Sequence, residues 1–374
     1  MWSPQSYKKI GSEKGLSDEL LETAITQSKA VFCNIPSILS LRHLACRTGI
    51  SYRKLRCFVE RSSYVPYKKF SIKKRSGGRR FIHVPDPDLM HVQRWFNEYV
   101  FKLVPVHPSS YAFTTGSSIK KCAAEHCGAQ WLIKLDITDF FESVSEIQVF
   151  RLFKGLGYQP LVSFEMARLC TVLILDKSPR THYSQWHVRK ENKIIPQYNQ
   201  KMLGYLPQGA ASSPLISNLV MKECDEKLTN IANRYKLSYT RYSDDLSFST
   251  RSKNFCRSKA KDVIFEVYEV LSKAGYRPQL RKTKIISPSS KKIILGLNVD
   301  GAEPLLQKEY KDKIRQHLYY IEKLGVAKHV EKRGFDSIWG FKSHLRGMID
   351  YANMIEEDYA KKCLDRFSNI DWPV

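Results

Sequence analysis

"RYSDDLSFST", residues 241–250, places two adjacent aspartates, Asp244 and Asp245, in a stretch that is otherwise rich in aromatic and β-prone residues. Its pattern predicts a β-hairpin with Ser243, Asp244 and Asp245 at the tip. Adjacent carboxylates repel each other, so they normally lie in water, contact cations or hold a metal ion. Simple solvation is one of these alternatives, because Ser-Asp-Asp is also good turn sequence.

A further acidic position follows an apolar run. "QWLIKLDITDFF", residues 130–141, reads as a buried strand that ends on Asp136 and Asp139. If this strand neighbours the hairpin, Asp136, Asp244 and Asp245 converge, and three carboxylates suit two Mg²⁺ ions with oxygen ligands. Two such ions clamp the attacking and leaving oxygens in phosphoryl transfer.

The charge balance favours a polyanionic partner. The 374 residues include 61 Lys and Arg against 37 Asp and Glu, a net charge of +24. Such an excess favours nucleic acid first and an anionic membrane surface second. No apolar run is long enough to span a membrane, and the first residues lack the apolar core of a signal peptide. We therefore expect a cytoplasmic protein without membrane association.

The cysteines indicate neither disulfides nor a metal-binding ribbon. Nine of them are spread along the chain without a C-x-x-C pair, which predicts reduced thiols. Cys122, His126 and Cys127 cluster, but three such groups without a matching second half are more often incidental than a zinc site.

Strands and helices are interspersed along the chain, which predicts an α+β fold. Residues 16–60 have the apolar spacing of short helices, and residues 64–85 alternate around a Gly-Gly turn, as in a hairpin. Seven of residues 68–80 are Lys or Arg, so the hairpin is a candidate for nucleic-acid or nucleotide contact, with a solvated face as the alternative. Residues 176–203 predict a surface loop or hairpin, and residues 305–374 predict basic helices.

Capping residues predict where two of the helices begin. Ser145 is a candidate N-cap. "LPQGAASSP", residues 206–214, is a loop of small residues in which Ser213 is the expected N-cap and Pro214 the first helical residue. Small residues before a helix permit close approach of a ligand. "KKIILGLNVDG", residues 291–301, reads as a strand.

The order and spacing of these motifs carry a specific resemblance. "LDITDFF", "LPQGAASSPLISNL" and "YSDD" resemble the palm motifs of reverse transcriptases, and "KKRSGGRRFIHVP" followed by "HVQRWFNEYV" is similar to their fingers. The resemblance covers roughly residues 64–300. Within that family the chain looks most like the bacterial retron group, because "CAAEHCGAQWLIKLDITDFF" precedes the first acid and no maturase or nuclease extension is visible.

The resemblance implies roles for the acids. Asp136 and Asp244 would ligate both Mg²⁺ ions, and Asp245 would support the catalytic one. Asp139 has no counterpart among the ligands, so we expect it to cap a helix or to lie in solvent.

It also implies a nucleotide-binding site. Gln208 and the backbone of residues 209–211, which begin with Gly209, would line the incoming nucleotide. Arg80, with Lys73 or Lys74, would hold its triphosphate, as guanidinium and ammonium groups do.

Two further roles follow from the resemblance, each with an alternative. Phe141 matches the steric-gate position, where an aromatic ring excludes a ribose 2′-hydroxyl; the alternative is core packing, for which Phe140 is the better candidate. Lys284 is a candidate for protonating the leaving pyrophosphate, with Lys282 as competitor and a solvated lysine as the alternative.

The sequence departs from the retron pattern in two motifs. The Asn-Ala-x-x-His motif appears with Cys122 in place of Asn and ends on His126, and the Val-Thr-Gly triplet retains only Gly296, after Leu295. Both motifs are associated with template RNA, so His126 is a candidate RNA contact. Ser243 stands where alanine is commoner, and we expect little chemical effect.

The C-terminal helices resemble the thumb that grips the template RNA in this family. We expect three of their aromatic residues to fill the interior: Tyr320, Phe335 and Trp339. We expect Lys342, His344 and Arg346 to lie on or beside the RNA-facing surface.

The resemblance thus implies a right-hand polymerase. Its parts would be a helical extension at 1–60, fingers at 61–130, a palm at 131–300 with the 176–203 insertion, and a thumb at 301–374. The enzyme would use its cognate structured non-coding RNA as template and primer, starting from a 2′-hydroxyl, and would make branched RNA-linked single-stranded DNA from deoxynucleoside triphosphates. The resemblance also implies a role in phage defence with a separate effector protein.

Three alternatives remain open. The chain could be a reverse transcriptase of another group, such as an intron-encoded or abortive-infection type. A catalytically idle RNA-binding scaffold is disfavoured by the intact acids. A metal-dependent phosphatase or cyclase would not need the "LPQG" loop or the basic hairpin.

Overall fold

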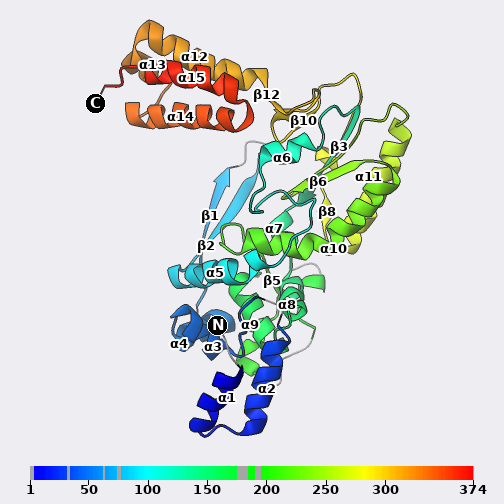
Figure 1. The fold of residues 1–374 in the computed structure, drawn as a ribbon, viewed down its shortest axis with the longest axis vertical. Coiled ribbons are helices and arrows are strands. Elements are labelled where there is room, and N and C mark those ends of the chain that lie inside the picture. The colour runs from blue at the N-terminus through cyan, green and yellow to red at the C-terminus, as the bar shows by residue number, and fades with distance from the viewer. Residues whose placement is uncertain are drawn as a thin grey trace. The chain divides into compact units, whose positions relative to one another are not determined.

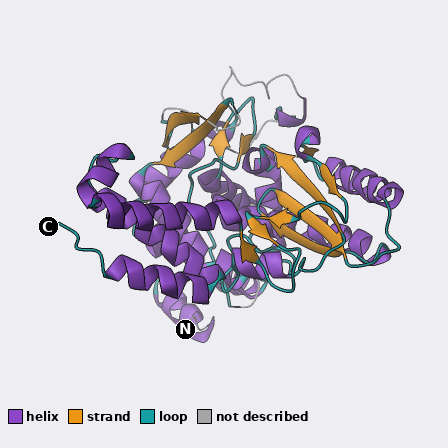
Figure 2. Ribbon diagram, turned by 90° about the horizontal axis from the view of Figure 1, so that it is seen from above, coloured by secondary structure: helices purple, strands orange, loops and turns teal. Residues whose placement is uncertain are grey.

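The computed structural model of the chain describes residues 4–31, 34–61, 64–73, 77–174, 184–189 and 195–373. These residues form two compact units, and Figure 1 labels most of their elements. Unit 1 comprises the described residues of Met1–Thr114, Ile137–Lys227 and Tyr268–Pro278; unit 2 comprises those of Thr115–Asp136, Leu228–Val267 and Gln279–Val374. The structure contains both helices and strands (Figure 2), so the α+β prediction is confirmed.

Unit 1 begins with short helices, as the apolar spacing predicts. Ser17, Ser40 and Ser51 each accept a hydrogen bond from a backbone N–H of the helix that follows, which satisfies a donor of its first turn. Ser145 caps α8 in the same way and forms a complete capping box with Gln148. The helices that lie wholly in unit 1 include α1 (Pro4–Glu13), α2 (Asp18–Lys29), α3 (Leu41–Thr48), α4 (Tyr52–Glu60), α5 (Pro87–Tyr99), α7 (Phe140–Ser143), α8 (Glu146–Gly155) and α9 (Pro160–Cys170), with a 3₁₀ turn η1 (Phe101–Leu103).

The basic hairpin is confirmed. Strands β1 (Tyr67–Lys73) and β2 (Arg79–Pro85) pair antiparallel, with Phe70 opposite Ile82 and Ile72 opposite Arg80. Because side chains alternate between the faces of a strand, these four share one face of the hairpin.

In its described part the insertion has an antiparallel bridge between His187 and Met202, as the hairpin alternative predicts, but it also buries aromatic side chains. Trp186 and Tyr198 are buried, on the 3₁₀ turns η3 (Ser184–Trp186) and η4 (Pro196–Tyr198). The short strands β4 (Val172–Leu173) and β5 (Gly204–Tyr205) pair at its base. The segment is polar on average, but its aromatic side chains still bury apolar surface area. Residues 175–183 and 190–194 lie outside the described residues.

A buried ionic cluster joins several segments of unit 1. The Glu146 carboxylate accepts hydrogen bonds from Arg61 Nη1 at 2.7 Å and Arg168 Nε at 3.2 Å. It also accepts from the Thr171 hydroxyl at 3.2 Å and the Gly204 N–H at 3.1 Å. Burial alone would raise the pKa of Glu146, but the two guanidinium groups outweigh it and hold that pKa below its usual value.

Two long helices contribute residues to both units: α10 (Ser213–Arg234) and α11 (Arg257–Lys273). Helix α10 begins one residue earlier than predicted, so Ser213 is its first residue and not its N-cap. The Ser213 hydroxyl donates to the Pro207 carbonyl at 2.8 Å, which ties the helix to the preceding loop.

Unit 2 contains most of an antiparallel sheet. Strand β3 (Trp131–Thr138) pairs on one side with β7 (Asp245–Thr250), which pairs in turn with β6 (Ser238–Tyr242), so the predicted hairpin is confirmed. On its other side β3 pairs with β9 (Lys284–Ile286). The last two residues of β3 belong to unit 1, where they pair with β8 (Arg277–Pro278).

The stretch 291–301 is not one strand, so that prediction was wrong. It folds back on itself as β10 (Ile293–Ile294) and β11 (Leu297–Asn298), and β12 (Leu305–Leu306) pairs with β11. Leu295 and Gly296 form the turn, both with positive φ, 48° and 84°. Such a pair suits the tight primed turns of hairpins, and glycine adopts this conformation without strain.

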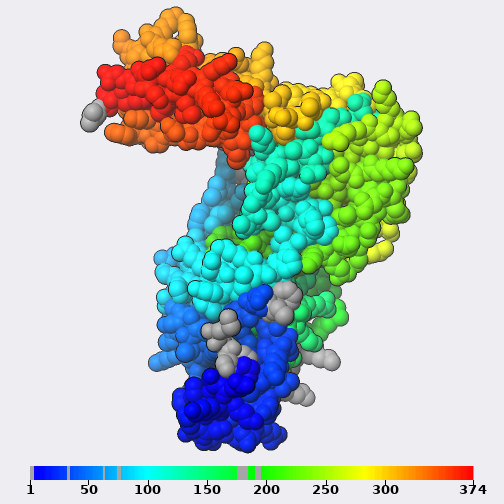
Figure 3. All heavy atoms as spheres, in the orientation of Figure 1, coloured from blue at the N-terminus to red at the C-terminus, as the bar shows by residue number. Residues whose placement is uncertain are grey.

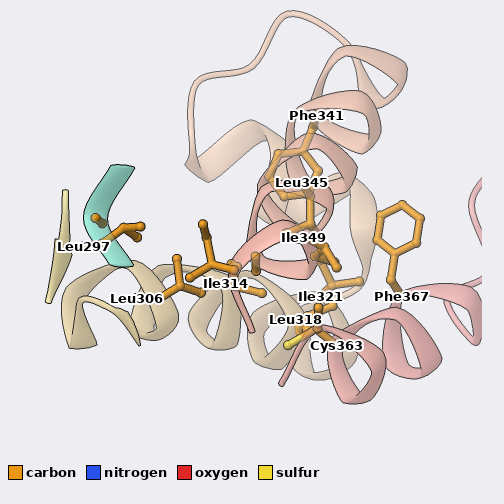
Figure 4. Packing of buried hydrophobic residues seen from close by; sticks show 14 of the residues in the cluster. Leu297, Leu306, Ile314, Leu318, Ile321, Phe341, Leu345, Ile349, Cys363 and Phe367 are labelled. Carbon is orange, nitrogen blue, oxygen red and sulfur yellow. The ribbon is translucent and has the colours of Figure 1, made fainter. Parts of the chain in front are cut away.

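The C-terminal helices pack around an apolar core. They are α12 (Lys308–Leu324), α13 (Val326–Lys332), α14 (Ile338–Ile355) and α15 (Glu357–Ser368). Figure 4 shows Ile314 and Leu318 of α12 close to Leu345 and Ile349 of α14, in a cluster that also includes Leu132 of β3. The prediction of basic helices after residue 305 is confirmed.

Candidate active site

Strand register brings the acidic motifs together in unit 2. Asp136 on β3 lies directly opposite Asp245, the first residue of β7. Asp244 precedes Asp245 in the turn that follows β6. Asp136 is buried, while Asp244 and Asp245 are half-buried. The sequence-based expectation that these acids converge is therefore met by the sheet itself.

The turn that presents the acids has an internal support that the sequence did not reveal. Ser243 adopts a left-handed conformation with φ of 60°. The fully buried Arg241 donates from Nη1 to the Ser243 carbonyl at 3.2 Å. In the sequence, the signal for this support was Arg241 itself, a charged residue at an inward-facing position of β6, two residues before Ser243.

The electrostatic environment of Asp136, Asp244 and Asp245 favours a bound cation. Burial raises the pKa of Asp245 to about 6, and the charges of Asp244 and Asp136 act in the same direction. The positive charges of Lys134 and Lys282 oppose that rise. A group of carboxylates that resists full ionisation is stabilised by any bound cation.

A lysine supplies one such cation. Lys282 Nζ donates to Asp136 Oδ2 at 2.6 Å, and this bond raises the pKa of Lys282. Lys284 is exposed on β9, opposite Lys134. Of the two lysines that the sequence offered, the structure thus places Lys282 beside the acids.

The donor set fits Mg²⁺, which prefers carboxylate oxygens. With the side chains as they lie, no three carboxylate, imidazole or thiol groups in the described part of the chain are gathered closely enough to hold a metal ion. The Lys282 ammonium on Asp136 shows, however, that a positive charge is already attracted to these oxygens.

In unit 1 the loop of small residues lies against the basic hairpin. The His83 N–H on β2 donates to the Gln208 carbonyl at 2.7 Å. Gly209 has φ of +109°, and a Cβ there would lie 2.8 Å from the His83 carbonyl oxygen and 2.9 Å from Ile82 Cγ2. Only glycine permits this approach. It places Gln208 and Gly209 beside the hairpin face that carries Arg80.

The cations of the hairpin are accessible. Arg80 and Lys73 are exposed. Lys74 lies outside the described residues. The contact with His83 and Ile82 was missed from the sequence, where neither residue carried a distinguishing signal.

The two neighbouring phenylalanines differ in burial. Phe140 is only 3% exposed and packs near Tyr276, with ring centroids 6.0 Å apart. Phe141 is half-buried, with its centroid 6.2 Å from that of Phe113. Phe140 is thus the core residue, and Phe141 keeps an accessible surface.

Asp139 is the N-cap residue of α7, but it caps through its backbone carbonyl, which accepts from the Ser143 N–H at 2.8 Å, and not through its side chain. It is exposed, with φ of 46°, at the position before α7, and its carboxylate makes no capping hydrogen bond. The other expectation, solvation, matches its position.

His126 is not available to RNA in this structure, which corrects the expected contact. It is only 1% exposed, and its ring nitrogens lie 2.7 Å from the hydroxyls of Ser249 and Thr240. Burial lowers its pKa to about 4, so the ring is neutral near pH 7. Cys122 Sγ also donates to Thr240. Hydroxyl partners within the fold satisfy this histidine without a ligand.

The expected RNA-facing residues lie on α14 in three different settings. The Lys342 ammonium lies 4.8 Å from the ring centroid of Trp339. Arg346 is exposed and forms an ion pair with Asp350 at 2.9 Å. His344 is exposed, but its ring lies against Phe335, with centroids 5.2 Å apart.

The interior role expected for the aromatic residues holds only in part. Phe335 packs against the buried Phe341, with centroids 5.1 Å apart. Trp339 is 60% exposed and Tyr320 is 41% exposed, so the expectation was wrong for these two. The helical spacing of aromatic residues does not reveal which side of the helix meets the core.

Comparisons with known proteins show what the chain is similar to. A family model described as reverse transcriptase (RNA-dependent DNA polymerase) matches residues 72–299. The chain is 30% identical over 344 residues to the retron Mx162 reverse transcriptase of Myxococcus xanthus, an alignment that covers 89% of this chain and 67% of that protein. It is 27% identical over 339 residues to the retron Ec86 reverse transcriptase of Escherichia coli, covering 89% and 94%.

Among solved structures, telomerase from Candida albicans in complex with a TWJ fragment of telomeric RNA is similar, with a TM-score of 0.42 and 11% identity. That similarity covers 95% of this chain and 71% of the telomerase chain.

Proposed function

This chain belongs to the reverse transcriptase family, in which it is of the retron type, and from that premise we propose how its own residues carry out RNA-directed DNA synthesis. The observation that carries the proposal is the register that sets Asp136 opposite Asp245, with Asp244 in the adjoining turn. Template RNA and deoxynucleoside triphosphates are the substrates of such an enzyme.

The family uses divalent metal ions, and we infer two Mg²⁺ ions for this chain. Asp136 and Asp244 would hold both ions, and Asp245 would support one of them. When bound, such ions stabilise the charge that develops on the attacking and leaving oxygens. The raised pKa of Asp245 and the attraction of Lys282 to Asp136 support a cation at these carboxylates.

Residues of unit 1 would bind the nucleotide. Arg80 and Lys73 present exposed charges for the triphosphate, and Lys74 joins them in the sequence. The contact between Gly209 and the face of β2 that carries Arg80 supports a common role for Gln208, Gly209 and the hairpin.

Lys282 is the better candidate to protonate the leaving pyrophosphate. Its ammonium already contacts Asp136, whereas Lys284 lies on β9 opposite Lys134. A lysine that is held at the carboxylates can deliver a proton where the leaving oxygen develops charge. Lys284 remains the alternative.

For the biological reaction we infer that the enzyme copies its cognate structured non-coding RNA from a 2′-hydroxyl primer. The product would be branched RNA-linked single-stranded DNA, made in the cytoplasm for phage defence with a separate effector protein. The retron reverse transcriptases among the relatives favour this role over an intron-encoded or abortive-infection enzyme. None of the described helices has the length and apolar character needed to cross a membrane. Fingers at 61–130, palm at 131–300 and thumb at 301–374 remain predicted boundaries.

The nucleic acid that copurifies with the protein tests this proposal. We expect one structured RNA covalently joined to single-stranded DNA, and we expect a 2′-5′ debranching enzyme to separate the two. RNA without DNA from the wild-type protein, or equal activity on any primed template with no preferred RNA, would contradict the retron role.

Replacing Phe141 by alanine is expected to weaken discrimination against ribonucleotides by about 10- to 100-fold, because a steric gate acts by volume. Primer extension with each nucleotide type measures the ratio. Phe141→Tyr keeps the ring and should keep the discrimination. Unchanged discrimination in the alanine variant would make Phe141 a packing residue only.

Removing two positive charges from α14 is expected to change the salt dependence of RNA binding. For every phosphate group that the variant no longer binds, the slope of log affinity against log salt should become shallower by roughly 0.7 to 0.9. RNA affinity of a Lys342→Ala, Arg346→Ala double variant across a salt series tests this. A Lys9→Ala, Lys14→Ala variant, which removes two exposed charges near α1, is the control. An unchanged slope for the α14 variant would contradict the role of these residues in RNA binding.

A further inference from the structure

An exposed tryptophan shares one face of α14 with the two cations. Trp339, Lys342 and Arg346 follow each other at spacings of three and four residues, so they lie along the same side of the helix. Trp339 is 60% exposed, although an indole ring gains much from burial. His344 lies roughly 200° around the helix from Lys342 and is not part of this face.

The cation beside this ring is held in place. The Lys342 ammonium lies 4.8 Å from the ring centroid of Trp339 and 5.3 Å from that of Trp372. Trp372 is fixed in turn, because its indole N–H donates to the Phe367 carbonyl at 3.4 Å and its ring packs against Phe367. The ammonium thus lies over one face of the Trp339 ring, so a positive charge and an aromatic surface are prearranged in contact, and a base would stack on the other face.

The surroundings of Trp339 favour nucleic acid over an apolar protein surface. Ser343, Arg346 and Asp350 follow it along the same face and are exposed. Apart from the half-buried Trp372, with which Trp339 shares the Lys342 ammonium, these neighbours are polar, so Trp339 does not belong to the kind of large apolar patch that a protein interface would use. The C-terminal helices α12 to α15 form the orange and red surface in Figure 3.

We propose that Trp339 is a stacking platform for an unpaired base of RNA, with Lys342 and Arg346 beside it for the flanking phosphates. Bases within a duplex are already stacked on each other, so only a single-stranded segment, loop or bulge can offer a free face to the indole. Asp350 holds Arg346 by an ion pair, so Lys342 is the principal phosphate ligand. This inference rests on the proposed RNA-binding role of the C-terminal helices.

The test compares a short oligo(A) RNA with an RNA duplex of the same length. Trp339→Ala should lower affinity for the single strand by about 10-fold, as expected for loss of one stacked base, and should leave duplex affinity unchanged. The slope of log affinity against log salt should not change, because the indole carries no charge. Trp339→Phe should restore most of the affinity.

Phe265 provides the control, since it is an exposed ring on α11 with 67% exposure. Phe265→Ala should bind both RNAs like the wild type. The proposal is overturned if Trp339→Ala keeps its single-strand affinity with the fold intact, if duplex binding falls equally, or if only binding of a protein partner is lost. Primer extension by the wild type tests the proposed function separately. A failure of the stacking proposal can therefore be told apart from a failure of the proposed polymerase function.

Discussion

Asp244→Asn is expected to abolish DNA synthesis while leaving the fold and RNA binding largely intact. Asparagine keeps the shape of the side chain but removes one of the negative charges that would hold the metal ions. Several kcal/mol of transition-state stabilisation depend on that arrangement, so the rate should fall by about 10³-fold or more. Primer extension by the purified variant, with RNA affinity measured in parallel, checks both parts of the expectation.

Asp139→Asn is the matched control. Asp139 belongs to the same acidic motif as Asp136, but it is exposed and makes no capping hydrogen bond with its side chain. Its variant should extend primers like the wild type. Near wild-type synthesis by Asp244→Asn would falsify the two-metal role, and equal losses in both variants would show that the assay reports only the loss of surface charge.

Glu146→Gln is expected to lower the free energy of unfolding by about 3–5 kcal/mol, a large share of the usual stability of a domain. The substitution leaves the guanidinium groups of Arg61 and Arg168 buried without their carboxylate, and both side chains are only 4–5% exposed. Urea denaturation followed by circular dichroism measures the loss. DNA synthesis is not the readout, because a destabilised protein loses activity for many reasons.

An exposed ion pair in the same unit gives the control for this prediction. Glu98 pairs with Lys102, and both side chains are about half exposed. Glu98→Gln should cost less than 1 kcal/mol, because solvent screens exposed pairs. A similarly small cost for Glu146→Gln would show that the cluster does not stabilise unit 1.

The same cluster predicts a pH dependence. The folded state holds the pKa of Glu146 below its ordinary value of 4.5, so the charged form is favoured by folding. Its contribution is fully present above about pH 4.5 and is lost as the pH falls through the lower folded value. The stability difference between wild type and Glu146→Gln should therefore shrink in acid, and a constant difference down to pH 2 would contradict this assignment.

The main strands and helices could be predicted from the sequence because their signals are local. The apolar run before Asp136, the turn residues at Ser243 and the cap at Ser145 each describe a few consecutive residues, and these elements formed where expected. Burial was missed where contacts distant in the sequence decide it. Trp186 and Tyr198 lie in a polar segment, yet both are buried.

For the acidic residues, too, the sequence predicted one part of the site and the tertiary structure decided the other. Their types and order, together with the resemblance, indicated metal-dependent phosphoryl transfer, because adjacent carboxylates need water, cations or a metal ion. Which lysine contacts Asp136 could not be read from "RKTKI", since Lys282 and Lys284 are equivalent in composition and differ only in how the chain enters β9.

By itself, the sequence determined the α+β class, the hairpins and the identity of the three acids, since alternation, turn chemistry and residue type are properties of neighbouring residues. Only the tertiary structure decided that His126 is enclosed by Ser249 and Thr240 and that Trp339 faces outward. The physical reason is that burial depends on which surfaces of different elements pack together. Helical spacing predicts that two residues share a face, but whether that face meets a core or the solvent depends on the rest of the chain.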